Sequence, residues 1–196
     1  MTRPFVFLAA IGLVAGTAQA ADLARAEAIV SQVCHLCHGK DGENSNAVYP
    51  RLAGQNAAYI TKQLADFKSG LRKGTMNSMA AGLDEADIAA LGAYFSSKPP
   101  KAHRVSEPEL AAVGEYIYQN GNKWSGVASC ASCHGAEAAG TDKLPRLAGQ
   151  HARYLVTQLK DFNTRERTND NAVMHSIASK LTELEIEAVA RYLSGK

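Results

Sequence analysis

Apolar side chains recur at helical spacing along this chain, and the pattern predicts a series of amphipathic helices. In residues 56–68, for example, Ile60 and Leu64 fall on one face of a helix. The same spacing recurs in residues 84–95 and 182–193. No segment alternates apolar and polar residues over the length of a strand, so the pattern predicts an all-α protein.

Polar residues mark where three of these helices begin. Thr182 and Glu185 have the spacing of a capping box, in which each side chain binds a backbone N–H at the helix start. Asp84 and Asp87 stand at the equivalent positions of an earlier helix. The segment 106–109 reads Ser-Glu-Pro-Glu, and its serine, followed by a proline in the first turn, predicts a further helix start.

The chain contains two copies of one pattern. From the proline at position 50 to Phe67, and from position 145 to Phe162, 12 of the 18 aligned positions are identical, which indicates a duplicated domain. The repeated elements are C-x-x-C-H-G at 34–39 and 130–135, P-R-L-A-G-Q at 50–55 and 145–150, and a methionine seven residues before a leucine, at Met76 and Met174.

The N-terminal segment has the pattern of a secretory signal peptide. An apolar run of 12 residues, 5–16, is shorter than the roughly 20 residues that span a bilayer. It ends in Ala-Gln-Ala at 18–20, which predicts cleavage after Ala20 and export to a bacterial periplasm. The alternative is an uncleaved membrane anchor.

The repeat and a proline-containing basic segment between its copies predict the domain organisation. We expect a signal peptide at 1–20, an N-terminal domain at 21–98, a linker at 99–105 and a C-terminal domain at 106–196.

Composition and charge exclude several classes of protein. The 196 residues are 46% hydrophobic and 20% charged, as in globular proteins. Twenty-one basic and 19 acidic residues leave a net charge of +2. That balance lacks the basic excess with which proteins neutralise phosphates, so no nucleic-acid partner is expected.

Three chemistries compete for the four cysteines. An exported protein can form disulfides, and cysteine with histidine can bind zinc. The motif C-x-x-C-H attaches haem in c-type cytochromes. A zinc site would need a fourth ligand, which neither half supplies. Two copies of the haem motif behind an export signal instead favour two covalently bound haem c groups. The attachment residues would be Cys34, Cys37, Cys130 and Cys133.

The axial ligands of each haem iron follow from the same repeat. The histidine that ends each motif, His38 or His134, would bind the iron on one side. A repeated methionine, Met76 or Met174, would bind it on the other, and this pair of ligands raises the reduction potential.

Two other residues lie close enough in sequence to compete as iron ligands. Met79 also lies near Met76, but the repeat aligns Met76 with Met174, so Met79 is expected to pack against haem or core. His175 follows Met174 directly, yet its counterpart is Asn77, which is not a haem-iron ligand.

These motifs together resemble the dihaem cytochrome c4 family over essentially the whole mature chain. The resemblance implies an all-α fold of two tandem class I cytochrome c domains, related by a pseudo-twofold axis and each enclosing one haem. It further implies that Pro50 and Pro145 offer their carbonyl oxygens to the proximal histidines. Arg51 and Arg146 would then either pair with haem propionates or be ordinary surface residues.

The resemblance also implies a function. It is that of a periplasmic electron carrier, soluble or peripherally bound to the membrane, between a respiratory donor complex and a terminal oxidase. The alternative is a dihaem subunit that accepts electrons in a flavocytochrome c-type dehydrogenase. A dihaem peroxidase is disfavoured, because both halves carry a methionine ligand. No catalytic residues are expected.

The other aromatic and histidine residues are not predicted to bind iron. Tyr59 and Tyr154 recur at helical spacing and are expected in the core. His35 and His151 are expected at the surface. Trp124 occurs only in the second half, where it either shapes the haem edge or fills a gap.

Overall fold

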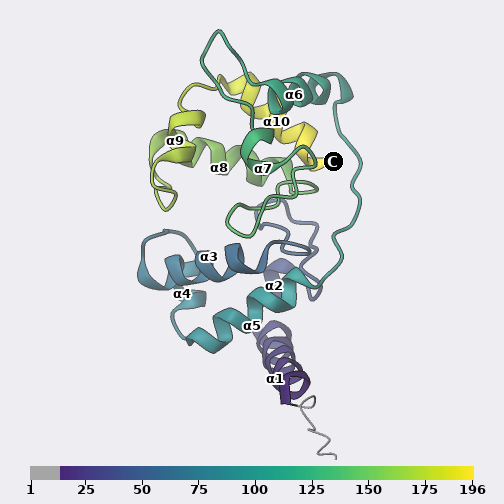
Figure 1. Ribbon diagram of the computed structural model, residues 1–196, viewed down its shortest axis with the longest axis vertical. Helices are drawn as coiled ribbons and strands as arrows, with labels where there is room; N and C mark the ends of the chain where they lie inside the picture. The colour runs from purple at the N-terminus through teal and green to yellow at the C-terminus, as the bar shows by residue number, and fades with distance from the viewer. Residues whose placement is uncertain (1–13) are drawn as a thin grey trace, which may run out of the picture.

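A computed structural model describes the backbone of residues 14–196 and the side chains from Asp22 onward. Most of the predicted signal peptide, including the start of its apolar run, lies outside the described residues. Two helical halves are stacked along the long axis of the molecule, and one extended segment joins them along one side (Figure 1). Within the described range the only β pairing is an isolated bridge between Asn122 and Val127, so the all-α prediction is confirmed.

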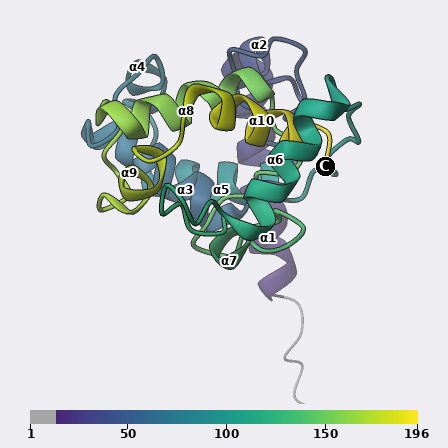
Figure 2. The same cartoon turned by 90° about the horizontal axis from the view of Figure 1, so that it is seen from above.

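The two halves contain matching sets of helices. The N-terminal half has α1 (Val14–Ile29), the π-helical turn η1 (Val30–Cys34), α2 (His35–His38), α3 (Ala57–Ser69), α4 (Met76–Ala80) and α5 (Glu85–Ser96). The C-terminal half has α6 (Pro108–Asn120), α7 (Ala131–His134), α8 (Ala152–Thr164), α9 (Val173–Ala178) and α10 (Glu183–Ser194). Viewed from above, the C-terminal helices overlie the N-terminal ones (Figure 2).

Both predicted capping boxes are present. The Asp84 side chain accepts the N–H of Asp87 at 2.7 Å, and the Asp87 carboxylate accepts the N–H of Asp84 in return. Thr182 and Glu185 make the same reciprocal pair at the start of α10. These bonds satisfy N–H groups that the first helical turn leaves without partners.

The start of α6 differs from the prediction in one respect. The helix does begin at Pro108, but no side chain caps it. Glu107 adopts a left-handed conformation with φ of 58°, and this turn separates Ser106 from the helix N-terminus. The Ser106 hydroxyl instead accepts a hydrogen bond from Arg191 at 3.3 Å.

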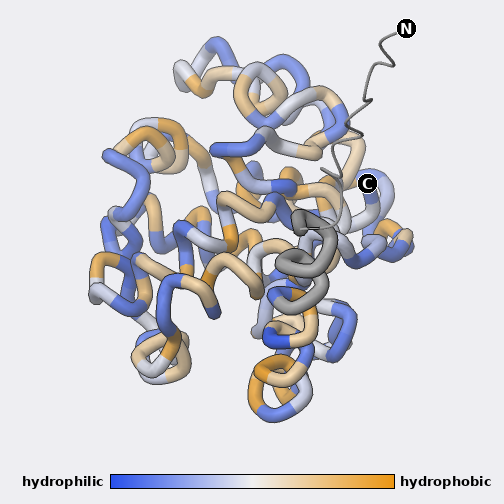
Figure 3. Tube along the Cα trace, turned by 60° about the horizontal axis from the view of Figure 1, so that its bottom comes forward, coloured by the Kyte–Doolittle hydropathy of each residue, from blue (hydrophilic) through white to orange (hydrophobic). Residues whose placement is uncertain are grey.

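Each half has its own apolar core. The N-terminal core is built mainly by α1, α3 and α5 and includes Val30, Leu91 and Phe95. The C-terminal core is built by α6, α8 and α10 and includes Tyr118 and Ile186, both with no exposed surface. Within the described residues no helix is long and apolar enough to cross a membrane. Figure 3 shows hydrophobic and hydrophilic residues intermixed along the helices.

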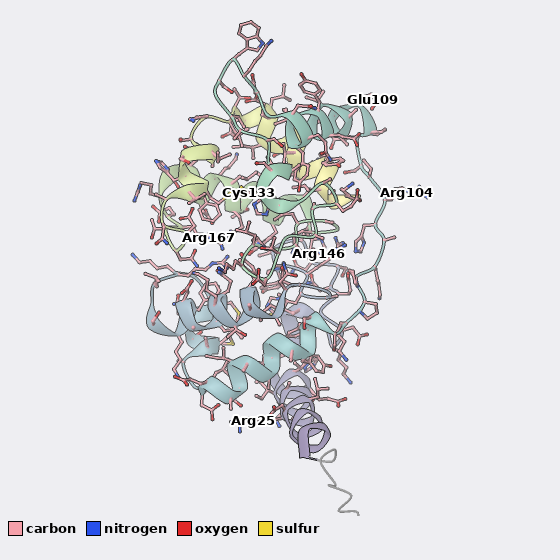
Figure 4. All side chains as sticks on the ribbon, in the orientation of Figure 1. Arg25, Arg104, Glu109, Cys133, Arg146 and Arg167 are labelled. Carbon is pink, nitrogen blue, oxygen red and sulfur yellow. The ribbon has the colours of Figure 1, made fainter. Side chains whose placement is uncertain are left out.

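The interface between the halves is largely polar. An Arg72 Nη donates to the hydroxyl of Tyr154 at 3.0 Å, and an Arg167 Nη donates to the hydroxyl of Tyr59 at 2.9 Å. The prediction that both tyrosines belong to a core is therefore wrong. Their rings are half-buried between the halves, where a hydroxyl can meet the guanidinium of the opposite half. Arg167 is labelled at this boundary in Figure 4.

Candidate haem-binding sites

The histidine of each C-x-x-C-H motif ends a short helix and is buried. His38 closes α2 with 6% of its surface exposed, and His134 closes α7 with 7% exposed. The Nδ1–H of His38 donates to the Pro50 carbonyl at 3.0 Å, and that of His134 donates to the Pro145 carbonyl at 3.3 Å. The implied role of the two prolines is thus confirmed.

This hydrogen bond selects the form of imidazole that binds a metal. Burial lowers the pKa of both His38 and His134, and the proline carbonyl opposes that shift only in part. The lowered pKa favours the neutral ring, and the bond to the proline carbonyl places its proton on Nδ1 and its lone pair on Nε2. Among the described residues, nothing forms a hydrogen bond with either Nε2, which leaves this nitrogen to a metal ion.

In each motif one cysteine lies four residues before the histidine and the other directly before it, and none of the four forms a disulfide. Cys34 and Cys130 pack against the cores of their respective halves. Burial raises the pKa of the Cys34 thiol, and it raises that of Cys130 to about 11. Cys133 is exposed, and Figure 4 shows it in the C-terminal half above Arg146.

The zinc alternative finds no support in the structure. Across the described part of the chain, no three histidine, cysteine or acidic side chains gather as they would around a metal ion. A structural zinc site needs about four such ligands. The C-x-x-C-H sequence with its buried histidine matches the attachment motif of haem c instead.

Two methionines stand on the short helices that follow α3 and α8. Met76 begins α4, is half-buried and packs against the same core as Cys34. Met174 lies in α9 and is also half-buried. Met79 is 48% exposed and does not belong to the core, so of its two predicted contacts, haem or core, the core contact is not observed and the haem contact stays a prediction.

The residue after each methionine anchors its loop. The Asn77 amide donates to the Phe67 carbonyl at 2.6 Å, and His175 donates through Nδ1 to the Phe162 carbonyl at 3.0 Å. Asn77 and His175 therefore make equivalent hydrogen bonds in the two halves. This contact identifies His175 as a residue that anchors the methionine loop. The sequence repeat aligned these two residues but gave no sign of their shared role.

The repeated arginines are not ordinary surface residues. Arg51 is half-buried, lies 3.3 Å from the Glu43 carboxylate and donates to the Gly149 carbonyl of the opposite half. The Nε of Arg146 is buried and has no hydrogen-bond partner among the described residues. An unpaired buried guanidinium N–H fits an acidic group such as a haem propionate, and Arg146 lies at the boundary of the halves in Figure 4.

Two further predictions need correction, and one of the two roles left open for Trp124 is excluded. His151 is only 8% exposed, because the start of α8 faces the other half, where Nε2 meets the Asn44 carbonyl at 3.1 Å. His35 is half-buried, since its Nδ1 meets the Val30 carbonyl at 3.1 Å. Trp124 is 87% exposed and fills no gap. Its ring lies 4.9 Å from the Lys123 ammonium.

This repeated site on an all-α fold defines the class of protein: two c-type cytochrome domains in one chain. Comparison with known families agrees. The family model "Cytochrome c" matches residues 118–195, and "Cytochrome C oxidase, cbb3-type, subunit III" matches residues 21–95.

Individual relatives specify the family. Cytochrome c4 of Thiocapsa roseopersicina is 40% identical, over 92% of this chain and 96% of its own. The thiosulfate dehydrogenase electron acceptor of Thiomonas intermedia is 36% identical, over 83% and 78%. The crystal structure of reduced cytochrome c4 from Pseudomonas stutzeri superposes with a TM-score of 0.84 at 36% identity, covering 88% of this chain and 97% of that one.

The chain belongs to the cytochrome c4 family. It is accordingly a dihaem electron-transfer protein with two haem c groups, and not an enzyme.

Proposed function

We propose that the two haems are held by the repeated residues, with one set in each half. In the N-terminal half, Cys34 and Cys37 form the thioether links, and His38 and Met76 are the axial ligands. In the C-terminal half these residues are Cys130, Cys133, His134 and Met174. The observation that carries the proposal is the duplicated buried histidine whose Nδ1–H is bound by a proline carbonyl.

The chain's own residues then perform three tasks. The proline carbonyls orient the proximal imidazoles and increase their basicity. The apolar cores keep water from the buried face of each site. The half-buried Met76 and Met174 would supply the second ligand of each haem iron and so would leave no coordination site for a substrate. Each haem, once bound, supplies a one-electron couple.

A closed coordination sphere makes a direct prediction about small ligands. We expect reduced holo-protein to bind carbon monoxide only slowly, and half-reduced protein to turn over peroxide no faster than a monohaem His/Met cytochrome. Stopped-flow absorption spectroscopy measures both. Rapid carbon monoxide binding to a native haem would contradict the proposed ligand sets.

The domain limits proposed from the sequence, 21–98 and 106–196 with a linker at 99–105, are supported by the two separate cores. Linker residues also contact the N-terminal half. The Lys101 N–H donates to the Glu43 carboxylate at 3.0 Å, and His103 lies 3.3 Å from it.

We further propose a place for this carrier in the cell. Export through a signal peptide cleaved after Ala20 would put it in the periplasm, where it would carry electrons from a respiratory donor complex toward a terminal oxidase, free or peripherally membrane-bound. A relative named as an electron acceptor of thiosulfate dehydrogenase supports an alternative, in which a dehydrogenase is the donor. A flavocytochrome c-type complex would be a further case of that kind.

Native membranes distinguish these partners. We expect reduced holo-protein to be reoxidised by membranes of the source organism, and immobilised holo-protein to capture an oxidase from them after mild solubilisation. Inhibition of the reoxidation by cyanide would identify a haem–copper oxidase. Stoichiometric co-purification with a flavoprotein, without reoxidation by membranes, would favour the dehydrogenase subunit instead.

A further inference from the structure

The side chain of Gln150 forms a two-point contact with a backbone segment of the opposite half. Its Oε1 accepts the N–H of Arg51 at 2.9 Å, and its Nε2 donates to the carbonyl of Arg51 at 2.9 Å. Gln150 is 7% exposed, so this contact is shielded from water. The amide therefore satisfies both backbone groups of one residue across the interface.

Gln55 makes the reciprocal contact. Its Oε1 accepts the N–H of Arg146 at 2.8 Å, its Nε2 donates to the Arg146 carbonyl at 2.9 Å, and it is 6% exposed. Each glutamine ends one copy of P-R-L-A-G-Q and binds the arginine of the other copy. The repeated motif is thus self-complementary across the pseudo-twofold axis.

The bound N–H groups belong to the peptide units that hold the proximal histidines. The Pro50 carbonyl, which accepts from His38, and the Arg51 N–H, which donates to Gln150, are the two ends of one peptide group. The same holds for Pro145 and Arg146. Because a peptide group is conjugated, an acceptor at its N–H increases the negative charge on its oxygen.

We infer that Gln150 and Gln55 are positioning residues that set the reduction potential of the haem in the opposite half. The inference rests on the proposed function, in which His38 and His134 are iron ligands. Gln150 polarises the carbonyl that binds His38, and a stronger bond at Nδ1 makes the imidazole a more basic ligand. A more basic ligand favours ferric iron, so loss of the glutamine amide raises the potential of the opposite haem.

Each glutamine substitution is expected to shift the reduction potential of the haem in the opposite half. In Gln150→Met, which keeps a side chain of similar volume, the reduced-to-oxidised ratio of the N-terminal haem at a fixed potential rises about threefold. Since tenfold corresponds to about 59 mV for one electron, this is a shift of about 28 mV. The C-terminal haem changes much less. Gln55→Met shifts the C-terminal haem in its place.

Potentiometric titration followed by NMR of the haem methyl groups measures each haem separately, once Met76→Ala and Met174→Ala assign the signals. In reduced protein, the Nδ1–H resonance of His38 moves upfield in Gln150→Met while that of His134 stays. A second variant, Gln150→Glu, replaces the amide oxygen that accepts the Arg51 N–H by a carboxylate oxygen. A carboxylate is the stronger acceptor, so the His38 Nδ1–H resonance moves downfield. This variant tests the inference if the methionine variant does not fold.

Asn56→Ala is the matched control. The Asn56 amide also donates across the interface, to the carbonyls of Thr141 and Leu144, but touches neither peptide group that binds a proximal histidine. It should leave both Nδ1–H resonances in place. Equal shifts of both haems, a shift within the same half, or no shift would overturn the inference. Two His/Met haems in the wild-type spectrum would still uphold the proposed function.

Discussion

Replacement of Met76 by alanine is expected to lower the potential of the N-terminal haem by about 100 mV or more, within the roughly 0.8 V range that axial ligands govern. Met76→Ala should also remove half of the red charge-transfer band of Met-ligated ferric haem. Removing a thioether ligand opens a coordination position and takes away a ligand that favours ferrous iron. Met79→Ala should change neither property.

The structure gives the reason for this difference. Met76 starts α4 and packs against the N-terminal core, whereas Met79 is 48% exposed, although both lie on the same short helix. Absorption spectra and redox titrations of both variants, with Met174→Ala as the C-terminal counterpart, make the comparison. Loss of half of the band in Met79→Ala alone would show that the ligand has been assigned to the wrong methionine.

Gly114→Ala is expected to destabilise the C-terminal half by about 3 kcal/mol, at the upper end of the usual cost of overpacking. A Cβ at Gly114 would lie 1.9 Å from the carbonyl oxygen of Ala188, a backbone atom of α10. Gly114 lies on α6 and Ala188 on α10, so the added methyl group would push the two helices apart. The packing of Tyr118 and Ile186 between them would then loosen. A backbone group cannot move aside as a side-chain end can.

Thermal unfolding of the holo-protein, followed by far-UV circular dichroism, measures this effect. Gly82→Ala is the control, because no atom lies within 4 Å of its added Cβ and its backbone conformation suits an L-residue. We expect a lower midpoint for Gly114→Ala, by roughly 10 °C, and an unchanged or slightly higher one for Gly82→Ala. Equal midpoints in the two variants would mean that α6 and α10 are not held at this contact.

The sequence by itself determined the helical class, the duplication and two capping boxes. Each rests on local information: apolar side chains at helical spacing face the core of their own half, and Thr182 or Asp84 satisfies N–H groups within three residues. The C-x-x-C-H-G motif is equally local, because its thiols and histidine must be presented from one turn of chain. The structure adds that both histidines are buried and bound by proline carbonyls.

Only the tertiary structure decided what lies between the halves. Tyr59 and His151 were expected in a core and at the surface, and both contact the opposite half instead. Gln55 and Gln150 repeat in the sequence, but repetition did not reveal that each binds backbone groups of the other copy. Hydrophobic periodicity reports burial of apolar side chains, whereas these polar side chains are buried because hydrogen-bond partners some 90 to 110 residues away satisfy them. Such pairings depend on how the two folded halves meet, which no local pattern in the chain records.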